Sequence, residues 1–205
     1  MGSSYRLELN RWLSQLDVKS DCLLDLGGSQ ENLKGRTKSW DVAEYLIADL
    51  PNPHVGSPKP DIEIDLNRAF ALNAGQVTEL SDGTTEYEKD IREKFDLIFC
   101  LEVFDYVWAT ETAFDNLYQL MKKGGTAWVS FPTVYPLHQP IEDDALRYMP
   151  AAVEKLADSV GLEVVQMIKR RPETNKWQEF FYAERMRGAK HQDHSFTGLI
   201  CEFRK

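Results

Sequence analysis

Four short apolar runs, each followed by an acidic residue, constrain the fold more than any other feature of this sequence. Three of the runs are almost continuously apolar, which is typical of strands buried on both faces of a parallel sheet. In open α/β sheets, ligands bind beyond the carboxyl ends of such strands. The pattern therefore predicts a parallel-type sheet with acidic residues at its ligand-binding end. The runs are 22–24 before Asp25, 45–48 before Asp49, 62–64 before Asp65, and 95–101 before Glu102.

Helical patterns around these runs favour an α/β fold, because strands that alternate with helices form parallel sheets. The apolar spacing of residues 9–16 predicts an opening helix. A second helix is expected from Thr110 to Lys123, closed by Gly124, and a third from Pro150 to Val160, stopped by Gly161. We also expect a short helix at Thr85 to Glu93 and strands at 126–131, 162–168 and 197–203, the last two close enough to pair as an antiparallel edge.

Length, charge and cysteine usage bound the class of protein. A chain of 205 residues fits a single domain, which we expect to span residues 1–205. The net charge of −9 disfavours duplex nucleic acid as a partner, because surfaces that bind it carry a basic excess. Three cysteines in apolar runs indicate free thiols in a reducing compartment. Residues 1–16 lack a signal-peptide region and no apolar run could span a bilayer, so we expect a cytoplasmic protein without membrane contact.

The glycines after the first run are the first candidate binding element. Gly27 and Gly28 would let the backbone turn sharply and approach a ligand, although an ordinary strand-to-helix turn would also use them. Asp49 follows by roughly the 20 residues at which a carboxylate receives ribose hydroxyls, since its two oxygens can accept from both. Asp65 could accept from an adenine amine or cap a loop. Three acidic residues at successive strand ends favour nucleoside binding over these alternatives.

Two longer phrases resemble a known family. Residues 95–107, FDLIFCLEVFDYV, are similar to the motif after the fourth strand of class I S-adenosylmethionine (SAM)-dependent methyltransferases. Residues 120–125, LMKKGG, resemble the helix end before the fifth strand in that family. Together with Asp25-Leu-Gly-Gly and Asp49, the resemblance covers about residues 20 to 168. It implies a Rossmann-like, mostly parallel seven-stranded sheet with an antiparallel last strand, helices on both faces, and SAM as the cofactor.

The resemblance also implies which residues bind SAM. It assigns Gly27, Gly28 and Ser29 to the amino-acid end of SAM and Asp49 to its ribose. Asp65 and Leu66 are assigned to the adenine, Leu101 and Glu102 to the sulfonium side, and Tyr106 to the wall of the pocket. Asp25 and Leu50 complete the set of implied cofactor-binding residues. One departure is visible: Ser29 and Glu31 stand where the family has further glycines. Glu31 is expected near the start of a helix, where its negative charge suits the helix dipole.

The segment after the expected fifth strand carries the candidate catalytic groups. Its phrase from Tyr135 to Tyr148 resembles an element of a subset of these enzymes linked to sugar and glycan modification. His138 could take a proton from a hydroxyl or amine nucleophile, with Asp144 orienting the imidazole. Arg147 could hold a carboxylate or phosphate of the substrate. Alternatively, His138 caps a loop, and Asp144 and Arg147 form a structural ion pair.

We therefore expect an enzyme that transfers a methyl group from SAM to a hydroxyl or amine of a small-molecule, sugar or glycan acceptor. DNA is disfavoured because neither a Pro-Cys pair nor an Asn/Asp-Pro-Pro-aromatic motif is present, whereas protein and RNA acceptors stay open. The main alternative is a catalytically degenerate methyltransferase fold that acts as a binding or structural subunit. A nicotinamide enzyme is disfavoured because Gly-x-Gly-x-x-Gly is missing after the first run. We predict no metal site, and the sequence leaves a homo-oligomer open.

Overall fold

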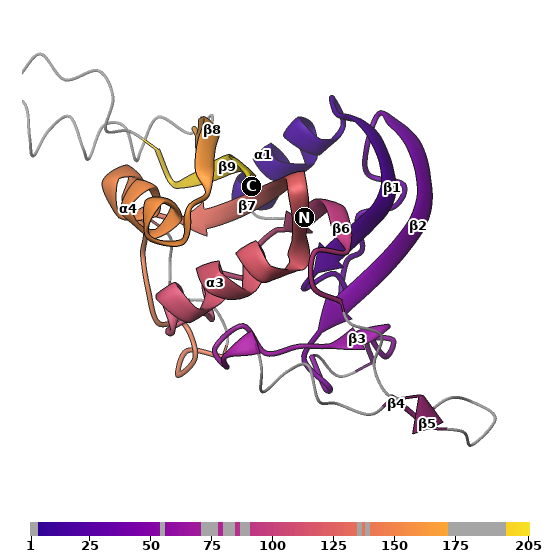
Figure 1. Ribbon diagram of the computed structural model, residues 1–205. Helices are drawn as coiled ribbons and strands as arrows, with labels where there is room; N and C mark the ends of the chain where they lie inside the picture. The colour runs from indigo at the N-terminus through magenta and orange to yellow at the C-terminus, as the bar shows by residue number, and fades with distance from the viewer. Residues whose placement is uncertain are drawn as a thin grey trace, which may run out of the picture.

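The computed structural model describes residues 4–53, 56–70, 78–79, 85–86, 91–134, 137, 140–171 and 196–205. Seven of its strands form one sheet (Figure 1): β1 (Asp17–Leu26), β2 (Ser39–Asp49), β3 (Ile62–Glu63), β6 (Phe95–Cys100), β7 (Met121–Pro132), β8 (Glu163–Arg170) and β9 (Gly198–Arg204). Their order is β3-β2-β1-β6-β7-β9-β8. The pairs from β3 to β7 are parallel, and β9 runs antiparallel to both of its neighbours. The predicted mostly parallel sheet with an antiparallel last strand is confirmed.

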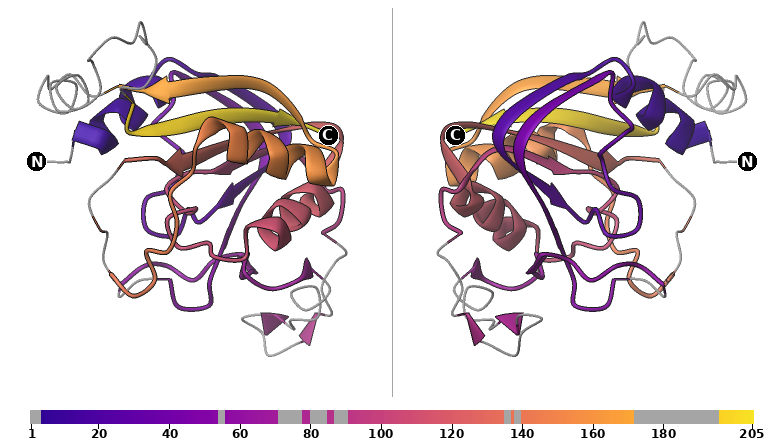
Figure 2. Two further views of the ribbon diagram at one scale, coloured as in Figure 1. Left: turned by 90° about the vertical axis from the view of Figure 1, so that its left-hand side faces the viewer. Right: turned by 90° about the vertical axis from the view of Figure 1, so that its right-hand side faces the viewer.

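Helices cover both faces of the sheet, as predicted. The described α-helices are α1 (Ser4–Leu13), α3 (Thr110–Leu120) and α4 (Pro150–Val160). α1 packs on one face, where Leu9 and Leu13 join a buried cluster with Leu23 and Phe99. α3 and α4 lie side by side on the other face (Figures 1 and 2). Each of the two faces therefore carries its own apolar core.

Neighbouring side chains of the central strands alternate between these two cores. Leu23 belongs to the cluster under α1, whereas Leu24 belongs to the cluster under α3 and α4. In the adjacent strand, Phe99 and Ile98 divide in the same way. Because successive side chains of a strand point to opposite faces, a run of apolar residues is needed where both faces are covered. The apolar runs of the sequence are the strands that meet this condition.

The second predicted helix ends earlier than expected. α3 stops at Leu120, and Met121 is already extended and paired with Phe95 of β6. The next register pair is Leu97 with Thr126, so the residues between Met121 and Thr126 form an irregular bulge in β7. The paired glycines serve this bulge rather than a helix cap: Gly124 has φ +77°, and a side chain at Gly125 would crowd two backbone carbonyls.

The short helix expected at Thr85 to Glu93 is also wrong for the described part of that range. Residues Thr85–Glu86 form strand β5, which pairs antiparallel with β4 (Thr78–Glu79) in a separate two-stranded sheet. Residues 92–93 form a turn, and 87–90 lie outside the described residues. A polar segment without a periodic apolar face carries little information about its secondary structure, and threonine favours extended backbone.

The first two strands extend beyond the apolar runs that predicted them. β1 begins at Asp17 and β2 at Ser39, well before Cys22 and Tyr45. Their early residues alternate between exposed and more buried positions, which is typical of strands with one solvated face. The carboxyl ends of both strands fall where the sequence predicted them, and these ends position the candidate site.

Candidate functional site

The glycine turn after β1 needs both of its glycines. Gly27 has φ +86° and donates its N–H to the carbonyl of Ala48 at 2.7 Å, so the turn is fixed to the end of β2. A side chain on Gly27 would overlap Val103 of the turn after β6. At Gly28, a β-carbon would overlap the carboxyl group of Asp25. The glycine turn therefore lies against the end of β2 and against the side chains of Val103 and Asp25, at distances that only glycine permits.

The side chain of Asp25 stabilises the loop that follows this turn. Its carboxylate is buried, and Oδ2 accepts hydrogen bonds from the N–H of Leu33 at 2.7 Å and from the Tyr45 hydroxyl at 2.5 Å. Burial raises the pKa of Asp25 to about 6, although both hydrogen bonds oppose that rise. Only 5% of Asp25 is exposed, so most of its surface contacts the loop rather than solvent.

The chain between β1 and β2 contains no helix, which corrects the expectation for Glu31. The residues from 27 to 38 form turns and bends. Glu31 instead forms ion pairs with Arg6 of α1 at 3.2 Å and with Arg36 at 3.8 Å. With Ser29 and Glu31 in place of further glycines, this loop is held by side-chain contacts to α1 and to Asp25. The dipole of a helix therefore does not contribute to the site here.

Ser29 and Asp49 are brought together as the nucleoside hypothesis requires. The N–H of Ser29 donates to Asp49 Oδ2 at 3.2 Å, and Asp49 Oδ1 accepts from the N–H of Leu50 at 2.8 Å. Each carboxylate oxygen keeps a second lone pair that can accept from a ribose hydroxyl. Ser29 is 4% exposed, and its buried Oγ has no hydrogen-bond partner among the described residues. A buried hydroxyl without a partner is costly unless a ligand completes it, so these residues fit the amino-acid and ribose parts of SAM.

The turn after β3 is organised by Asn67, which the sequence analysis did not single out. Asp65 Oδ1 accepts from the N–H of Asn67 at 2.9 Å. Asn67 then bridges to the loop after β6: its Nδ2 donates to the carbonyl of Tyr106 at 3.3 Å, and its Oδ1 accepts from the N–H groups of Trp108 and Ala109 at 2.9 and 3.1 Å. Asn67 therefore fixes the two loops that would enclose an adenine.

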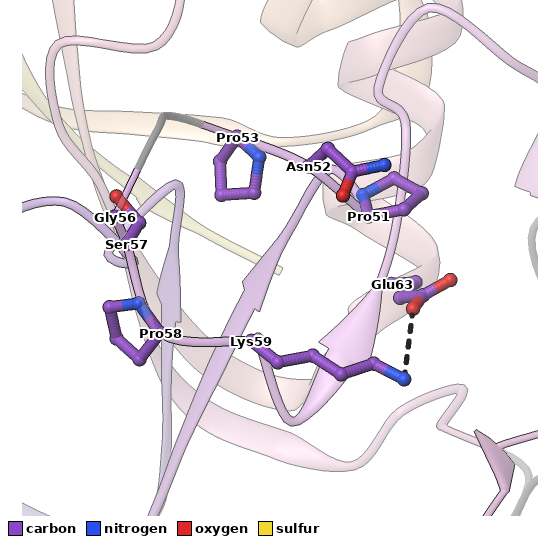
Figure 3. A pocket seen from close by; sticks show the side chains of 8 residues that line it. All are labelled: Pro51, Asn52, Pro53, Gly56, Ser57, Pro58, Lys59 and Glu63. Atoms are coloured by element: carbon purple, nitrogen blue, oxygen red, sulfur yellow. Dashed lines mark ion pairs between the residues drawn. The ribbon is translucent and has the colours of Figure 1, made fainter.

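Three other predicted cofactor residues differ in their exposure. Leu66 is only 6% exposed and belongs to the core under α3 and α4, which leaves little of its surface for a ligand. Leu101 is partly buried against the cluster under α1. Leu50 is 44% exposed in the loop after Asp49. A shallow hollow of about 660 Å³ lies in that same loop, lined by residues of 51–59 and by Glu63, which forms an ion pair with Lys59 (Figure 3).

Glu102 lies at the carboxyl end of β6 in a strained conformation. Its φ is +59°, which is unusual for a residue with a side chain. Its N–H donates to Ser130 Oγ at 2.7 Å, and its Oε1 accepts from the Ser130 hydroxyl at 2.8 Å and from Arg170 Nη1 at 2.6 Å. Ser130 is a polar residue within an apolar strand, and that signal could have identified it. Arg170 was visible only as part of a short basic cluster.

The loop between β7 and α4 contains the predicted acid–cation pair. Nη1 and Nη2 of Arg147 donate to the two carboxylate oxygens of Asp144, at 2.5 and 2.7 Å. This is the ion pair that the sequence analysis kept as the alternative to substrate binding. His138 lies outside the described residues, so its predicted role as a base stays a prediction. Asp144 is engaged by Arg147 in the described structure.

Asp105 is a further buried carboxylate at this end of the sheet that the sequence analysis did not select. It is 5% exposed, and its backbone carbonyl accepts from the N–H of Ala145 at 3.1 Å, which joins the loops after β6 and β7. Burial, together with the carboxylates of Glu102 and Asp144, raises the pKa of Asp105 to about 7, while the nearby arginines lower it. The sequence signal was its place in the phrase FDLIFCLEVFDYV, three residues after Glu102.

Comparisons with known proteins agree with this geometry. A family model for a methyltransferase domain matches residues 64–129, from the turn after β3 into β7. A search of curated proteins gave no match. A SAM-dependent methyltransferase from Mesorhizobium loti is similar in structure over 100% of this chain and 99% of its own, at 13% identity and a TM-score of 0.57. One from Archaeoglobus fulgidus is similar over 100% and 95%, at 11% identity and a TM-score of 0.60.

A third similar structure carries ligands. It is the 1,6-didemethyltoxoflavin-N1-methyltransferase of Burkholderia thailandensis, solved with 1,6-didemethyltoxoflavin and S-adenosylhomocysteine; it matches over 99% of this chain and 78% of its own, at 9% identity and a TM-score of 0.55. At such identities the likeness shows the fold. The chain has the fold of class I SAM-dependent methyltransferases. Within its described part, no helix is long and apolar enough to cross a membrane, and no cluster of His, Cys, Asp and Glu side chains is suited to a metal.

Proposed function

We propose that this protein is a SAM-dependent methyltransferase whose acceptor presents a hydroxyl or an amine, on a small molecule or a sugar. The observation that carries the proposal is the pair of Ser29 and Asp49: a buried hydroxyl with no partner in the described part of the chain, beside a carboxylate at the end of β2. The methyltransferase fold and the family match over residues 64–129 support it. The proposal treats residues 1–205 as one domain, because the sheet uses strands from β1 to β9.

The residues present would divide the binding of SAM among four strand ends. Gly27, Gly28 and Ser29 would receive its amino-acid end, and Asp49 its ribose. Asp65, in the turn that Asn67 holds, would lie toward the adenine. When bound, SAM supplies a methyl group that its sulfonium already activates for transfer. The protein then has to align the acceptor with that methyl group, exclude water and, for some acceptors, remove a proton.

The proton acceptor in this proposal is His138, in the loop between β7 and α4. Its neighbours Asp144 and Arg147 are paired with each other in the described part of that loop. We therefore assign Arg147 and Asp144 to the shape of the loop and leave proton removal to His138. Glu102 and Tyr106 would border the transfer site from the loop after β6.

A second candidate function is favoured by one observation. The loop from 27 to 38 forms no helix, and Glu31 in it is tied to Arg6 and Arg36 rather than facing a ligand. Part of the usual binding surface for the amino-acid end of SAM is therefore replaced. Such a loop suits a catalytically degenerate methyltransferase fold that works as a binding or structural subunit.

Isothermal titration with SAM and S-adenosylhomocysteine separates the enzyme from a purely structural subunit, and an assay of methyl transfer then separates it from a subunit that binds SAM without turnover. We expect micromolar binding that Asp49→Ala weakens about 10- to 100-fold, because hydrogen bonds to a charged group contribute about 1.5–3 kcal/mol. Asp41→Ala is the matched control, since Asp41 lies at the other end of the same strand in an exposed ion pair with Lys19. If the folded protein binds neither nucleoside, the enzyme proposal is wrong and the structural role remains.

A further inference from the structure

We propose that the acceptor is an amine with an apolar body, and that for this acceptor Asp105, in place of His138, binds the ammonium group and takes its proton. The inference rests on the proposed methyltransferase function and names the substrate class of that same site. Asp105 follows the carboxyl end of β6, in the loop that borders the expected transfer site. Its carboxylate is buried, and among the described residues no hydrogen bond or ion pair reaches it.

Among the described residues, the charges around Asp105 leave a net negative charge at its position. Four charged groups of the described part act on its carboxylate: Glu102, Asp144, Arg147 and Arg170. Arg170 forms an ion pair with Glu102 at 2.6 Å, and Arg147 forms a bidentate ion pair with Asp144. The two acids and two bases therefore balance as pairs, and Asp105 is the remaining charge. A buried carboxylate of this kind is stabilised by a cation brought by a ligand.

An ammonium group is the cation that fits this place best. The described residues offer no cluster of ligands for a metal ion. A neutral hydroxyl acceptor would leave the carboxylate without a counter-charge, whereas an ammonium group would supply one. Burial lowers the pKa of an amine and raises that of a carboxyl group, to about 7 for Asp105, so the proton can pass between them more readily than in water.

The chemistry then balances in three events. The ammonium group gives one proton to the Asp105 carboxylate and becomes a neutral amine with a lone pair. That lone pair forms the new N–C bond to the methyl carbon, while the C–S bond of SAM breaks and leaves its electron pair on sulfur. The product is a methylated ammonium ion, and the Asp105 carboxylic acid returns its proton to solvent.

Exposed apolar side chains on the loops after β6 and β7 favour an acceptor with an apolar body. Trp108, Leu146 and Met149 are 68%, 37% and 53% exposed. The two loops are joined by the hydrogen bond from the N–H of Ala145 to the carbonyl of Asp105 and by one from the Tyr148 hydroxyl to the carbonyl of Val107 at 3.0 Å. Large apolar side chains exposed on the two loops that contact Asp105 and each other suit an amphipathic ligand.

The test compares matched amines and alcohols on the full chain saturated with S-adenosylhomocysteine. The probe pairs are hexylamine with hexanol, phenethylamine with 2-phenylethanol, and tryptamine with tryptophol. We expect at least one amine to bind tenfold or more tightly than its alcohol at pH 8. Asp105→Asn should reduce that ratio to within about twofold, and Asp115→Asn, an exposed aspartate of α3, should leave it unchanged.

The pH dependence gives a second readout. In the native protein, the affinity for the amine should rise through pH about 7, as Asp105 loses its proton, and this rise should be missing in Asp105→Asn. Binding of S-adenosylhomocysteine should stay within about twofold in both variants. If the nucleoside binds but no probe pair shows an amine preference that depends on Asp105, the inference is overturned and the methyltransferase proposal stands. If the nucleoside does not bind at all, both are overturned.

Discussion

Arg170, the last residue of β8, donates a hydrogen bond from Nη1 to Glu102 Oε1 at 2.6 Å. The strands that carry them are separated in the sheet by β7 and β9, so the guanidinium group reaches across two strands to the candidate site. The side chain of Arg170 is 1% exposed and that of Glu102 is 24% exposed. The pair fixes a residue whose φ is +59°. It therefore joins the edge of the sheet to the end of β6.

Replacement of Arg170 should lower the free energy of unfolding. Arg170→Met leaves the Glu102 carboxylate partly buried without its ion-pair partner, and removing one member of a buried pair costs about 3–5 kcal/mol. Because Glu102 is partly exposed, we expect the lower end, about 3 kcal/mol in the free energy of unfolding measured in urea. Arg204→Met is the control, since its ion pair with Glu163 is exposed at 3.9 Å and should contribute about 1 kcal/mol or less. Equal losses in the two variants would mean that the Glu102 pair adds no special stability.

Gly27 and Gly35 form a matched pair for testing the glycine turn. Both have a left-handed backbone, with φ +86° and +89°, but a side chain would overlap Val103 at Gly27 and meets nothing within 4 Å at Gly35. Gly35→Ala should therefore cost only the left-handed penalty, about 1–2 kcal/mol. Gly27→Ala should cost clearly more and should also abolish SAM binding, because the turn must shift away from β6. Urea unfolding and titration with SAM measure both effects, and similar losses in the two variants would refute the packing argument.

The sequence predicted the elements that depend on local apolar pattern. The carboxyl ends of β1, β2 and β6 were found because an apolar run must end where a strand leaves the covered part of the sheet. Gly27 and Asp49 were predicted at the ends of neighbouring strands because their spacing follows from one strand and one connection, and the hydrogen bond from Gly27 to Ala48 agrees with that placement, whereas their binding roles stay a prediction. The start of α4 at Pro150 and its stop at Gly161 were found because both residues have fixed conformational preferences.

Other features depend on contacts that spacing does not encode. Asn67 forms hydrogen bonds with Tyr106, Trp108 and Ala109, some forty residues away. No local sequence pattern indicates a residue that joins two loops in this way. The glycines at 124 and 125 were assigned to a helix end, whereas a bulge opposite β6 uses them. The chain between β1 and β2 forms turns and bends instead of the expected helix, and the ion pairs of Glu31 with Arg6 and Arg36 in this loop form only in the folded chain.

Two substitutions of Asn67 test how much its hydrogen bonds stabilise the loops after β3 and β6. Asn67→Ala removes the bonds to Tyr106, Trp108 and Ala109, and we expect a loss of about 2–3 kcal/mol in the free energy of unfolding. Asn67→Asp keeps an acceptor oxygen for the two N–H groups but replaces the donor to Tyr106 by a second oxygen that faces the Tyr106 carbonyl, so a smaller loss of about 1–2 kcal/mol is expected. Affinity for S-adenosylhomocysteine should fall in the same order. A variant series in which alanine and aspartate behave alike would show that the acceptor oxygen does not organise the loop.

Asp25 predicts how stability changes with pH. Its pKa rises from 3.8 to about 6 on folding, so between these values the folded protein holds a proton that the unfolded chain has released. Unfolding then releases a proton, and the free energy of unfolding falls as pH rises through this window, by about 3 kcal/mol in total. Below pH 4 the group contributes nothing, and above pH 6 the full cost is present. Urea unfolding at several pH values measures the fall.

The variant Asp25→Asn separates the effect of Asp25 on the pH dependence of stability from that of Asp105. The pKa of Asp105 is also raised in the folded protein, so its ionisation also lowers the free energy of unfolding as pH rises. The asparagine oxygen can still accept from Leu33 and from Tyr45, so the turn keeps its two hydrogen bonds without a titrating group. The difference in free energy of unfolding between variant and native protein should therefore shift by about 3 kcal/mol in favour of the variant between pH 4 and pH 7. A difference that does not change with pH would mean that the folded and unfolded states ionise Asp25 alike.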